Sequence, residues 1–257
     1  MSSSPLNTLR PRMLVLINLD SAVERRQAMA RQLGACSLAY ERVGVDLRCV
    51  RPTEVDAAIE RRFPALRFDR TALSNAEIGC WLSHLTAWQT LLERPDETAC
   101  AVIEDDLQLM PHFAAAIDAL AGQTAFDLVY LGTSSRNVSQ RRRTQIGGLQ
   151  VHAPVGVILN TWGYVVTRAY AARFFSAGRR HIRHPIDHYL GGRGKRTRPH
   201  IGVLQPAAVR EDPILGAASQ IGPYTRRIDR SRLFEKLRRR LMASSVSALY
   251  YALYRYL

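Results

Sequence analysis

The sequence contains little cysteine, and several familiar motifs are absent from it. Its four cysteines, among 257 residues, form no CxxC pair and have no zinc-finger spacing. We therefore expect reduced, mostly buried thiols, as in a cytosolic protein. GxGxxG, P-loop, GxSxG and HExxH patterns do not occur, which disfavours dehydrogenases, P-loop enzymes and the common hydrolases. No internal repeat with a period of about 20–50 residues is visible.

A long apolar run is also missing near the start of the sequence. Residues 1–5 lack a basic stretch followed by an apolar one, and the apolar run 13–17 is too short for a secretory signal or a membrane span. We therefore expect this part of the protein to stay in the cytoplasm.

Positive charge is abundant. The chain has 36 Lys and Arg residues against 22 Asp and Glu residues, a formal net charge of +14 and a pI of about 10.4. Such a charge favours an anionic partner: nucleic acid, an anionic membrane face or a phosphorylated substrate. Hydrophobic residues make up 47% and charged residues 23%, which suits one large α/β domain, alone or with an appendage.

The most informative stretch is an apolar run, 99–103, that ends in Glu104, Asp105 and Asp106. The run predicts a strand buried on both faces, as in a parallel sheet, and the carboxyl end of such a strand opens onto a ligand-binding crevice. Adjacent carboxylates repel each other unless a cation lies among them, and Mg²⁺ or Mn²⁺ often bridges carboxylates to a diphosphate. The alternative is a solvated acidic turn that precedes the next helix.

A second candidate contact lies near the start of the chain. Residues 13–19 predict a buried strand, and a helix follows that ends at Gly34. Arg25 and Arg26 fall in the first turns of this helix, where they could contact a diphosphate. The alternative is that both arginines belong to a solvated helix face.

The clearest helix prediction covers 75–93, where Ser74 and Glu77 form a capping box. Gly79 is unfavourable within a helix by about 1 kcal/mol relative to Ala, so we expect another segment to approach the backbone there. His84 is expected beside Cys80, away from the main apolar stripe. Its role is either a structural hydrogen bond or part of a site.

The remaining elements follow from apolar periodicity and turn residues. Strands are predicted at 37–43, 126–132, 155–160, 163–167 and 201–209, helices at 52–62, 111–121 and 168–177, and polar loops at 64–70 and 134–148. A short helix begins near Pro185 and places Asp187 in its first turn. Asp187 either complements the helix dipole or acts as a catalytic or acceptor-binding carboxylate.

The C-terminal segment, 228–257, differs from the rest of the chain because it predicts a basic amphipathic helix. We therefore expect a tail at 1–12, one domain at 13–227 and this helix at 228–257. Its apolar and basic residues include Leu233, Leu237, Leu241, Leu249 and Leu253 with Arg232, Lys236, Arg238, Arg239 and Arg240. This pattern is typical of a helix that lies on an anionic membrane surface. The alternative is a helix that docks on the domain or on a second subunit.

The order of these segments resembles glycosyltransferase family 25, the bacterial lipooligosaccharide and lipopolysaccharide core glycosyltransferases. The segments that carry the resemblance are, in order, INLD with the following arginines, AEIGCWLSHLTAWQ, AVIEDDL, NTWGYVVT and HPID. The resemblance implies a GT-A-like α/β fold, a Rossmann-type sandwich with a mixed, mostly parallel central sheet. It also implies metal-assisted transfer with inversion from a UDP-sugar, typically UDP-galactose, with Mn²⁺ or Mg²⁺ as cofactor.

The same resemblance assigns roles to individual residues. Asp106, and next to it Asp105, are the expected metal ligands. Asp187 is the first expected catalytic base, and Glu104 or Asp106 is the second. The residues expected near the nucleotide sugar are Asn18, Arg25, Arg26, Ser83, His84 and Asp105. One departure from the family pattern is Trp162, since relatives often carry a small residue before the Gly-Tyr pair.

These inferences combine into one expected function, with alternatives. The protein is expected to transfer a sugar to a lipid-linked or phosphorylated glycan of the lipopolysaccharide type, at the inner face of the cytoplasmic membrane. The alternatives are another metal-dependent nucleotidyl or phosphoryl transferase, a basic nucleic-acid-binding protein, and a catalytically inactive scaffold. No recognised nucleic-acid-binding motif is present, so we expect no nucleic-acid partner.

Overall fold

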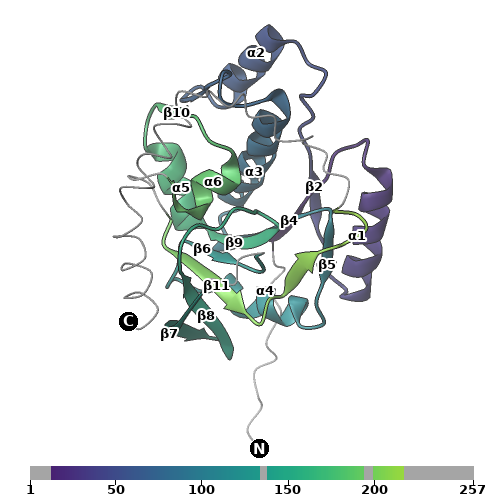
Figure 1. The fold of residues 1–257 in the computed structure, drawn as a ribbon, viewed down its shortest axis with the longest axis vertical. Helices are drawn as coiled ribbons and strands as arrows, with labels where there is room; N and C mark the ends of the chain where they lie inside the picture. Colours follow the sequence, from purple (N-terminus) through teal and green to yellow (C-terminus); the bar gives the residue numbers. More distant parts are fainter. Residues whose placement is uncertain (1–12, 134–137, 194–198, 217–257) are drawn as a thin grey trace, which may run out of the picture.

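The computed structural model describes residues 13–133, 138–193 and 199–216, which form a mixed α/β structure (Figure 1). The helices are α1 (Val23–Ala35), α2 (Pro52–Arg62), α3 (Asn75–Glu93), α4 (Phe113–Ala121), α5 (Arg168–Ser176) and the short α6 (Ile186–His188), which leads into a π-helical turn, Tyr189–Arg193. The strands are β1 (Met13–Ile17), β2 (Glu41–Val43), β3 (Leu66–Phe68), β4 (Ala99–Glu104), β5 (Leu107–Leu109), β6 (Leu128–Tyr130), β7 (Val138–Ile146), β8 (Leu149–Pro154), β9 (Gly163–Thr167), β10 (Arg180–Ile182), β11 (Ile201–Gln205) and β12 (Val209–Glu211).

The central sheet has the strand order β2-β1-β4-β9-β6-β11-β8-β7. β1 pairs in parallel with β2 and β4, and β6 pairs in parallel with β11. The other pairings, β4–β9, β9–β6, β11–β8 and β8–β7, are antiparallel. The predicted mixed sheet is confirmed. The prediction that it is mostly parallel is wrong, because β9 enters its middle antiparallel and the β7–β8 hairpin extends one edge.

Side chains of the central strands alternate between two apolar cores. In β4, Cys100 and Val102 pack in the core that includes α3 and α5, whereas Ala101 and Ile103 pack in the core that includes α1 and α4. A strand buried on both faces requires this period of two. The described residues therefore form an α/β sandwich, with helices on both faces of the sheet (Figure 1).

Helix α3 begins where the capping box predicted. The Ser74 hydroxyl accepts from the backbone N–H of Glu77, and the Glu77 carboxylate accepts from the backbone N–H of Ser74. The close approach predicted at Gly79 is also confirmed, because a Cβ added there would lie 2.5 Å from the carbonyl oxygen of Val45. The segment that follows β2 therefore lies directly against α3.

The carboxyl ends of β2, β1 and β4 lie at one edge of the sheet, because these strands are parallel. Ile17 at the end of β1 is in register with Glu104 at the end of β4. The chain order reverses between these two strands, and open α/β sheets bind ligands at such a switch point. The start of β9 reaches the same edge, since Gly163 pairs with Ile103.

Three other predictions differ from the structure. Residues 138–146 of the predicted loop 134–148 form strand β7, which makes a hairpin with β8, and Gly147 and Gly148 turn the chain at φ +53° and +84°. The β7 side chains are mostly exposed, so no apolar alternation revealed the strand. The predicted strand 155–160 is not formed, and β3 lies in the predicted loop 64–70, where it pairs with β10.

Some predictions fall on residues that the structure does not describe. These are the tail 1–12, the last part of the predicted domain, 217–227, and the basic helix 228–257. Within the described ranges, no helix combines the length and the apolar character that crossing a membrane demands.

Candidate functional site

Glu104, Asp105 and Asp106, which we call the acidic turn, lie at the switch-point edge and line a cavity of about 200 Å³. The other described residues that line it are Ile17, Asn18, Leu19, Arg25, Val45, Asp46, Leu47, Arg48, Ala76, Cys80, Ser83, Glu211 and Gly216. Ligand pockets usually enclose about 300–1,000 Å³. This cavity can therefore hold part of a larger ligand, whose remainder would extend over the open edge.

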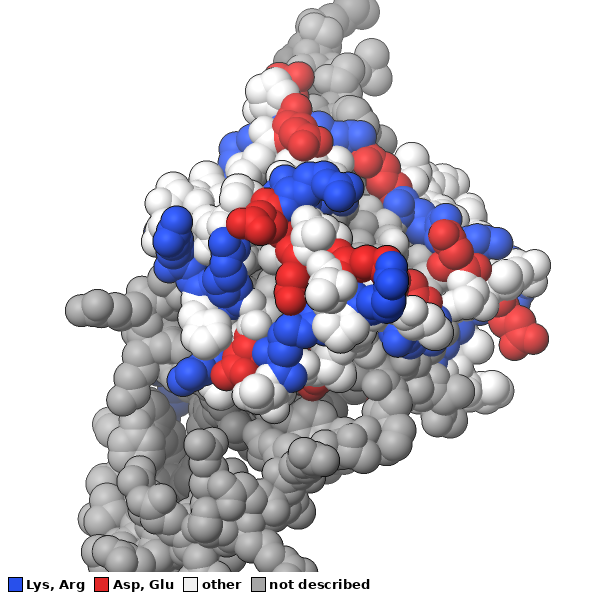
Figure 2. Space-filling view, turned by 90° about the horizontal axis from the view of Figure 1, so that it is seen from above, with Lys and Arg blue, Asp and Glu red and all other residues white. Residues whose placement is uncertain are grey.

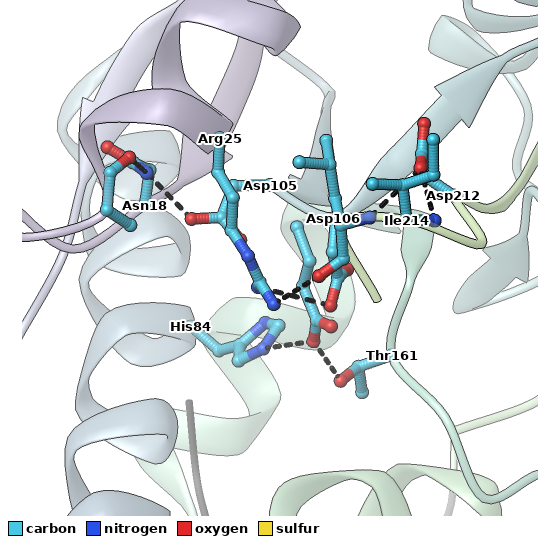
Figure 3. Close-up of polar contacts among 11 residues, drawn as sticks. Asn18, Arg25, His84, Asp105, Asp106, Thr161, Asp212 and Ile214 are labelled. Carbon is cyan, nitrogen blue, oxygen red and sulfur yellow. Dashed lines mark hydrogen bonds and ion pairs between the residues drawn. The ribbon is translucent and has the colours of Figure 1, made fainter. Parts of the chain in front are cut away.

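Asp105 is fixed from both sides (Figure 3). Asn18 Nδ2 donates to Asp105 Oδ2 at 2.7 Å, and Arg25 Nη1 donates to Asp105 Oδ1 at 3.0 Å. The same Arg25 nitrogen lies 3.3 Å from Asp106 Oδ2, and Nη2 donates to the carbonyl of Leu215 at 2.6 Å. Arg25 therefore ties α1 to the acidic turn and to the segment 211–216.

The protonation of the two aspartates follows from their surroundings. Burial raises the pKa of Asp105, although hydrogen bonds from Asn18 and Arg25 oppose this effect. Burial, together with the negative charge of Glu104, raises the pKa of Asp106 to about 7, against the opposing charge of Arg25. Arg25 alone thus leaves the negative charge of the acidic turn incompletely compensated. A further cation beside Asp106 would favour its ionised form.

Asp106 is the residue of the acidic turn that fits a metal ion best. Its Oδ1 is buried and makes no hydrogen bond with any described residue. In Asp105, by contrast, both carboxylate oxygens already accept hydrogen bonds. Mg²⁺ is commonly held by one or two carboxylates, with substrate phosphates and waters as its other ligands. A carboxylate oxygen without a partner among the described residues, on a residue that lines the cavity, suits that arrangement.

Glu104 points toward α3 instead. Its Oε1 accepts a hydrogen bond from Thr161 Oγ1 and lies 3.5 Å from Nε2 of the fully buried His84 (Figure 3). His84 Nδ1 lies 2.8 Å from the Tyr164 hydroxyl, which also accepts from Trp88 Nε1 at 3.0 Å. Burial disfavours the charge of Glu104, but the contacts with His84 and Thr161 outweigh it and lower the pKa of Glu104.

A segment near the end of the described chain closes one side of the site. The backbone N–H of Asp212 donates to the carbonyl of Asp106 at 2.8 Å, and Asp212 Oδ1 accepts from the backbone N–H groups of Ile214 and Leu215. These bonds hold the Leu215 carbonyl where Arg25 contacts it. The sequence predicted only a polar loop here.

The other predicted residues differ in their placement. Ser83 lines the cavity, but its hydroxyl donates to the carbonyl of Gly79 and accepts from the N–H of Val45, so it anchors the segment after β2 to α3. Arg26 is half-buried on α1 and is not among the described residues that line the cavity.

Asp187 lies in the first turn of the short helix α6 and is also outside the described cavity lining. Its Oδ1 accepts from the backbone N–H of His188 at 2.7 Å, as expected for a carboxylate in a first helical turn. Burial raises the pKa of Asp187 to about 6, and the negative charge of Glu104 adds to this effect. Asp187 and the acidic turn therefore interact electrostatically.

The comparison with known families decides what kind of protein carries this site. The family described as "Glycosyltransferase family 25 (LPS biosynthesis protein)" matches residues 13–190. The chain belongs to glycosyltransferase family 25. The match includes every residue of the acidic turn, the helix α3 and Asp187, so the predicted family membership is confirmed.

Curated relatives are similar over the same part of the chain. Procollagen galactosyltransferase 1 of Danio rerio is 27% identical over 185 residues, which cover 68% of this chain and 30% of that protein. Procollagen galactosyltransferase 2 of Homo sapiens is 25% identical over 185 residues, covering 69% and 29%. A Mus musculus protein named "Inactive glycosyltransferase 25 family member 3" is 27% identical over 123 residues, covering 46% and 20%. The chain thus spans less than a third of these relatives.

Several groups in the site were not predicted. Thr161 and Tyr164 belong to the NTWGY stretch, but their contacts with Glu104 and His84 depend on β9 lying antiparallel beside β4. Cys80 was expected near His84, yet its place in the cavity wall was not. Burial, and then the charge of Glu104, raises the pKa of the Cys80 thiol well above its usual range.

Proposed function

We propose that this protein is an enzyme of the GT-A-like fold that transfers a hexose from a UDP-sugar to a glycan acceptor, with inversion and metal assistance. Its membership of glycosyltransferase family 25 supports the reaction class. The observation that carries the proposal is Asp106, which lines the cavity at the switch point of the sheet and whose buried Oδ1 makes no hydrogen bond with any described residue.

The proposed cofactor is Mn²⁺ or Mg²⁺, held by Asp106 through Oδ1. When bound there, the ion would neutralise the negative charge that gathers on the departing diphosphate. Asp105 would not ligate the ion, because both of its oxygens are engaged by Asn18 and Arg25. Its role is instead to hold Arg25 in position beside Asp106.

Arg25 would also stabilise the negative charge on the departing diphosphate, as a positive group that the protein holds in place. Its guanidinium is 10% exposed and bonded to two carboxylates and one carbonyl. A charge fixed in this way needs no reorganisation during the reaction. A diphosphate beside Asp106 would therefore lie near a second positive group that the protein itself supplies.

The proton of the acceptor hydroxyl requires a base. Asp187 is the first candidate, since burial raises its pKa to about 6, which leaves it largely ionised at neutral pH while keeping useful basicity. Glu104 is the second candidate. Its pKa is lowered instead, and Thr161 already donates to its Oε1. This makes Glu104 the weaker base of the two.

The donor is proposed to be UDP-galactose, and the acceptor a lipid-linked or phosphorylated glycan of the lipopolysaccharide type. The names of two relatives as procollagen galactosyltransferases support galactose, and the family description, "LPS biosynthesis protein", supports the acceptor. Trp162 is half-buried beside the acidic turn, where its carbonyl accepts from the backbone N–H of Glu104. It is the residue most suited to adjusting the sugar or acceptor pocket.

A cytoplasmic location at an anionic membrane surface completes the proposal. Residues 228–257 contain seven Lys and Arg residues but two Asp and Glu residues, a composition that favours anionic lipid. Replacing Arg238, Arg239 and Arg240 together with Ser should weaken binding to anionic liposomes and reduce its dependence on salt. Unchanged, salt-sensitive binding would contradict this role.

Binding of nucleic acid is the less favoured alternative. Figure 2 views the molecule from above relative to Figure 1, and blue basic side chains there lie among red acidic ones. Ion pairs at this end include Arg70 with Asp56 and Arg67 with Glu60. Such a mixed surface differs from the continuous basic stripe typical of nucleic-acid-binding proteins.

The test is an assay with a panel of UDP-, GDP- and CMP-sugars, with and without Mn²⁺, followed by detection of the released nucleotide and by thermal shift. A ligand that binds the native state must raise its stability. The expected result is Mn²⁺-dependent stabilisation by UDP-sugars and slow release of UDP. Release of pyrophosphate instead would favour a nucleotidyl transferase, and no response to any of the sugars would contradict the proposal.

A further inference from the structure

Cys80, His84 and Glu104 form a second cluster of potential metal ligands, which we call the thiol cluster. Cys80 Sγ, one ring nitrogen of His84 and a carboxylate oxygen of Glu104 all lie within 4.8 Å of one another. Cys80 and His84 are one turn apart on α3, so both side chains leave the same face of the helix. Glu104 faces them from the end of β4.

An unsatisfied nitrogen points to a ligand at this cluster. His84 is fully buried, and its Nε2 makes no hydrogen bond with any described residue. Glu104 Oε1 lies 3.5 Å from this nitrogen. A buried polar atom without a partner is unfavourable, because it loses its hydrogen bonds to water and gains none in the protein. A cation between the imidazole and the carboxylate would satisfy both groups.

The surrounding hydrogen bonds also resemble the support of a metal site. A metal-binding histidine usually engages its other ring nitrogen in a hydrogen bond, and a ligating carboxylate is usually hydrogen-bonded as well. Here His84 Nδ1 lies 2.8 Å from the Tyr164 hydroxyl, which is held in turn by Trp88. Thr161 donates to the Glu104 carboxylate. Both ligands are thus oriented from outside the cluster.

We propose that Cys80, His84 and Glu104 form a site for a borderline-soft divalent cation such as Zn²⁺, with one coordination position open to the cavity. Thiolate, imidazole and carboxylate are the ligand types of protein zinc sites, and sites with three protein ligands keep a fourth position free. Cys80 and Glu104 both line the cavity, which gives that position its opening. A bound metal deprotonates a coordinating thiol outright.

This site differs from the one proposed at Asp106. Mn²⁺ and Mg²⁺ prefer carboxylate, carbonyl and water oxygens, whereas thiolate selects softer ions. Glu104 and Asp106 belong to the same acidic turn but face different neighbours: Glu104 faces α3, and Asp106 Oδ2 faces Arg25. The thiol cluster does not depend on transferase activity, so each proposal can fail without the other.

The experiment titrates the full-length protein with Co²⁺ and Zn²⁺ alone, without any sugar nucleotide. We expect Co²⁺ to produce a thiolate-to-metal charge-transfer band, and Zn²⁺ to displace it. Cys80→Ser should abolish the band and weaken Zn²⁺ binding by at least about 10- to 100-fold. Cys36→Ser is the matched control, because Cys36 is also a free, half-buried cysteine, and it should leave both unchanged. Equal spectra and affinities in the wild type and Cys80→Ser would overturn the proposal.

Two further measurements separate the possible causes of a lost signal. Asp106→Asn should keep the Co²⁺ band, which distinguishes this site from the proposed Mn²⁺ site. In the unmodified protein, Zn²⁺ should slow alkylation of Cys80 by about tenfold or more without protecting Cys36, a readout that no folding defect can affect. Equal alkylation rates with and without Zn²⁺ would overturn the proposal.

Discussion

The two sides of the acidic turn are built differently. On the α1 side, Asp105 is enclosed by Asn18 and Arg25, and a built-in cation compensates much of its charge. On the α3 side, Glu104 faces the imidazole of His84 and the thiol of Cys80. Residues adjacent in the sequence therefore have different chemical roles.

The alternation of side chains along β4 explains this division. Cys100 and Val102 point into the α3 core, so Glu104, two residues further, points the same way. Ala101 and Ile103 point into the α1 core, and Asp105 follows them toward Arg25. Asp106 lies beyond the strand, and its Oδ1 has no hydrogen-bond partner among the described residues. The comparison predicts that substitutions on the two sides have different effects.

The largest expected effect is on catalysis, at Asp106. Asp106→Ala should reduce transfer from a UDP-sugar by about 100- to 1,000-fold or more, because it removes electrostatic stabilisation of the departing diphosphate. The thermal unfolding of this variant should stay cooperative. Asp96→Ala, which alters an exposed aspartate in a turn, is the control and should keep full activity. A folded Asp106→Ala protein with wild-type transfer would rule out the role.

Arg25 should have the largest effect on stability. Arg25→Ala leaves Asp105 and Asp106 without their shared cation, and breaking a buried ion pair in this way is unfavourable by about 3–5 kcal/mol. Urea unfolding measures the change. Arg26→Ala changes the neighbouring, half-buried arginine and should alter stability by about 0.5 kcal/mol or less. Equal losses in both variants would contradict the special role of Arg25.

The wall of the cavity on the α3 side depends on Gly79. Gly79→Ala would place a methyl group 2.5 Å from the Val45 carbonyl, and we expect a loss of about 1–3 kcal/mol. Gly34→Ala is the matched control on helix α1, where a Cβ meets nothing within 4 Å, so it should gain about 0.5–1 kcal/mol. Thermal unfolding of the two variants should therefore shift in opposite directions, and shifts in the same direction would be inconsistent with the structure.

Asp187 should show a stability effect no larger than that of Gly79, and this effect depends on pH. Its pKa is about 6 in the folded protein against 3.8 for the ordinary group, so stability falls as pH rises between these values. Asp187→Asn removes this loss and should raise stability by about 1–3 kcal/mol at pH 7.5 but not at pH 4. Unfolding at the two pH values measures the difference. A gain of equal size at both would show that Asp187 does not titrate in this way.

Much of the site could be predicted because it lies on strongly patterned elements. Three predictions each rested on one simple physical cause, and the structure confirms them. They are the buried strand before Glu104, the start of a helix at the Ser74 capping box, and the close approach of another segment to Gly79. The alternation along β4 could also have assigned Glu104 and Asp105 to opposite faces. That alternation does not say which helix lies against each face, so the different neighbours of Glu104 and Asp105 could not be predicted from it.

What could not be predicted depends on long-range pairing. β7 is mostly exposed and rich in arginine, so its pairing with β8 leaves no apolar pattern to detect. The Leu215 carbonyl accepts a hydrogen bond from Arg25, which lies 190 residues earlier in the chain. This contact could not be predicted, because every residue has a backbone carbonyl. Thr161 reaches Glu104 because β9 runs antiparallel to β4, an arrangement that a mostly parallel sheet would not have suggested.

The most direct test of the central claim is a calorimetric titration of UDP into the wild-type protein and Asp106→Asn, each with and without Mn²⁺. We predict that Mn²⁺ tightens UDP binding to the wild type at least about tenfold, a change of about 1.4 kcal/mol, and that Asp106→Asn loses this gain while still unfolding cooperatively. Equal dependence on Mn²⁺ in both proteins, or no dependence in the wild type, would contradict a cation held by Asp106.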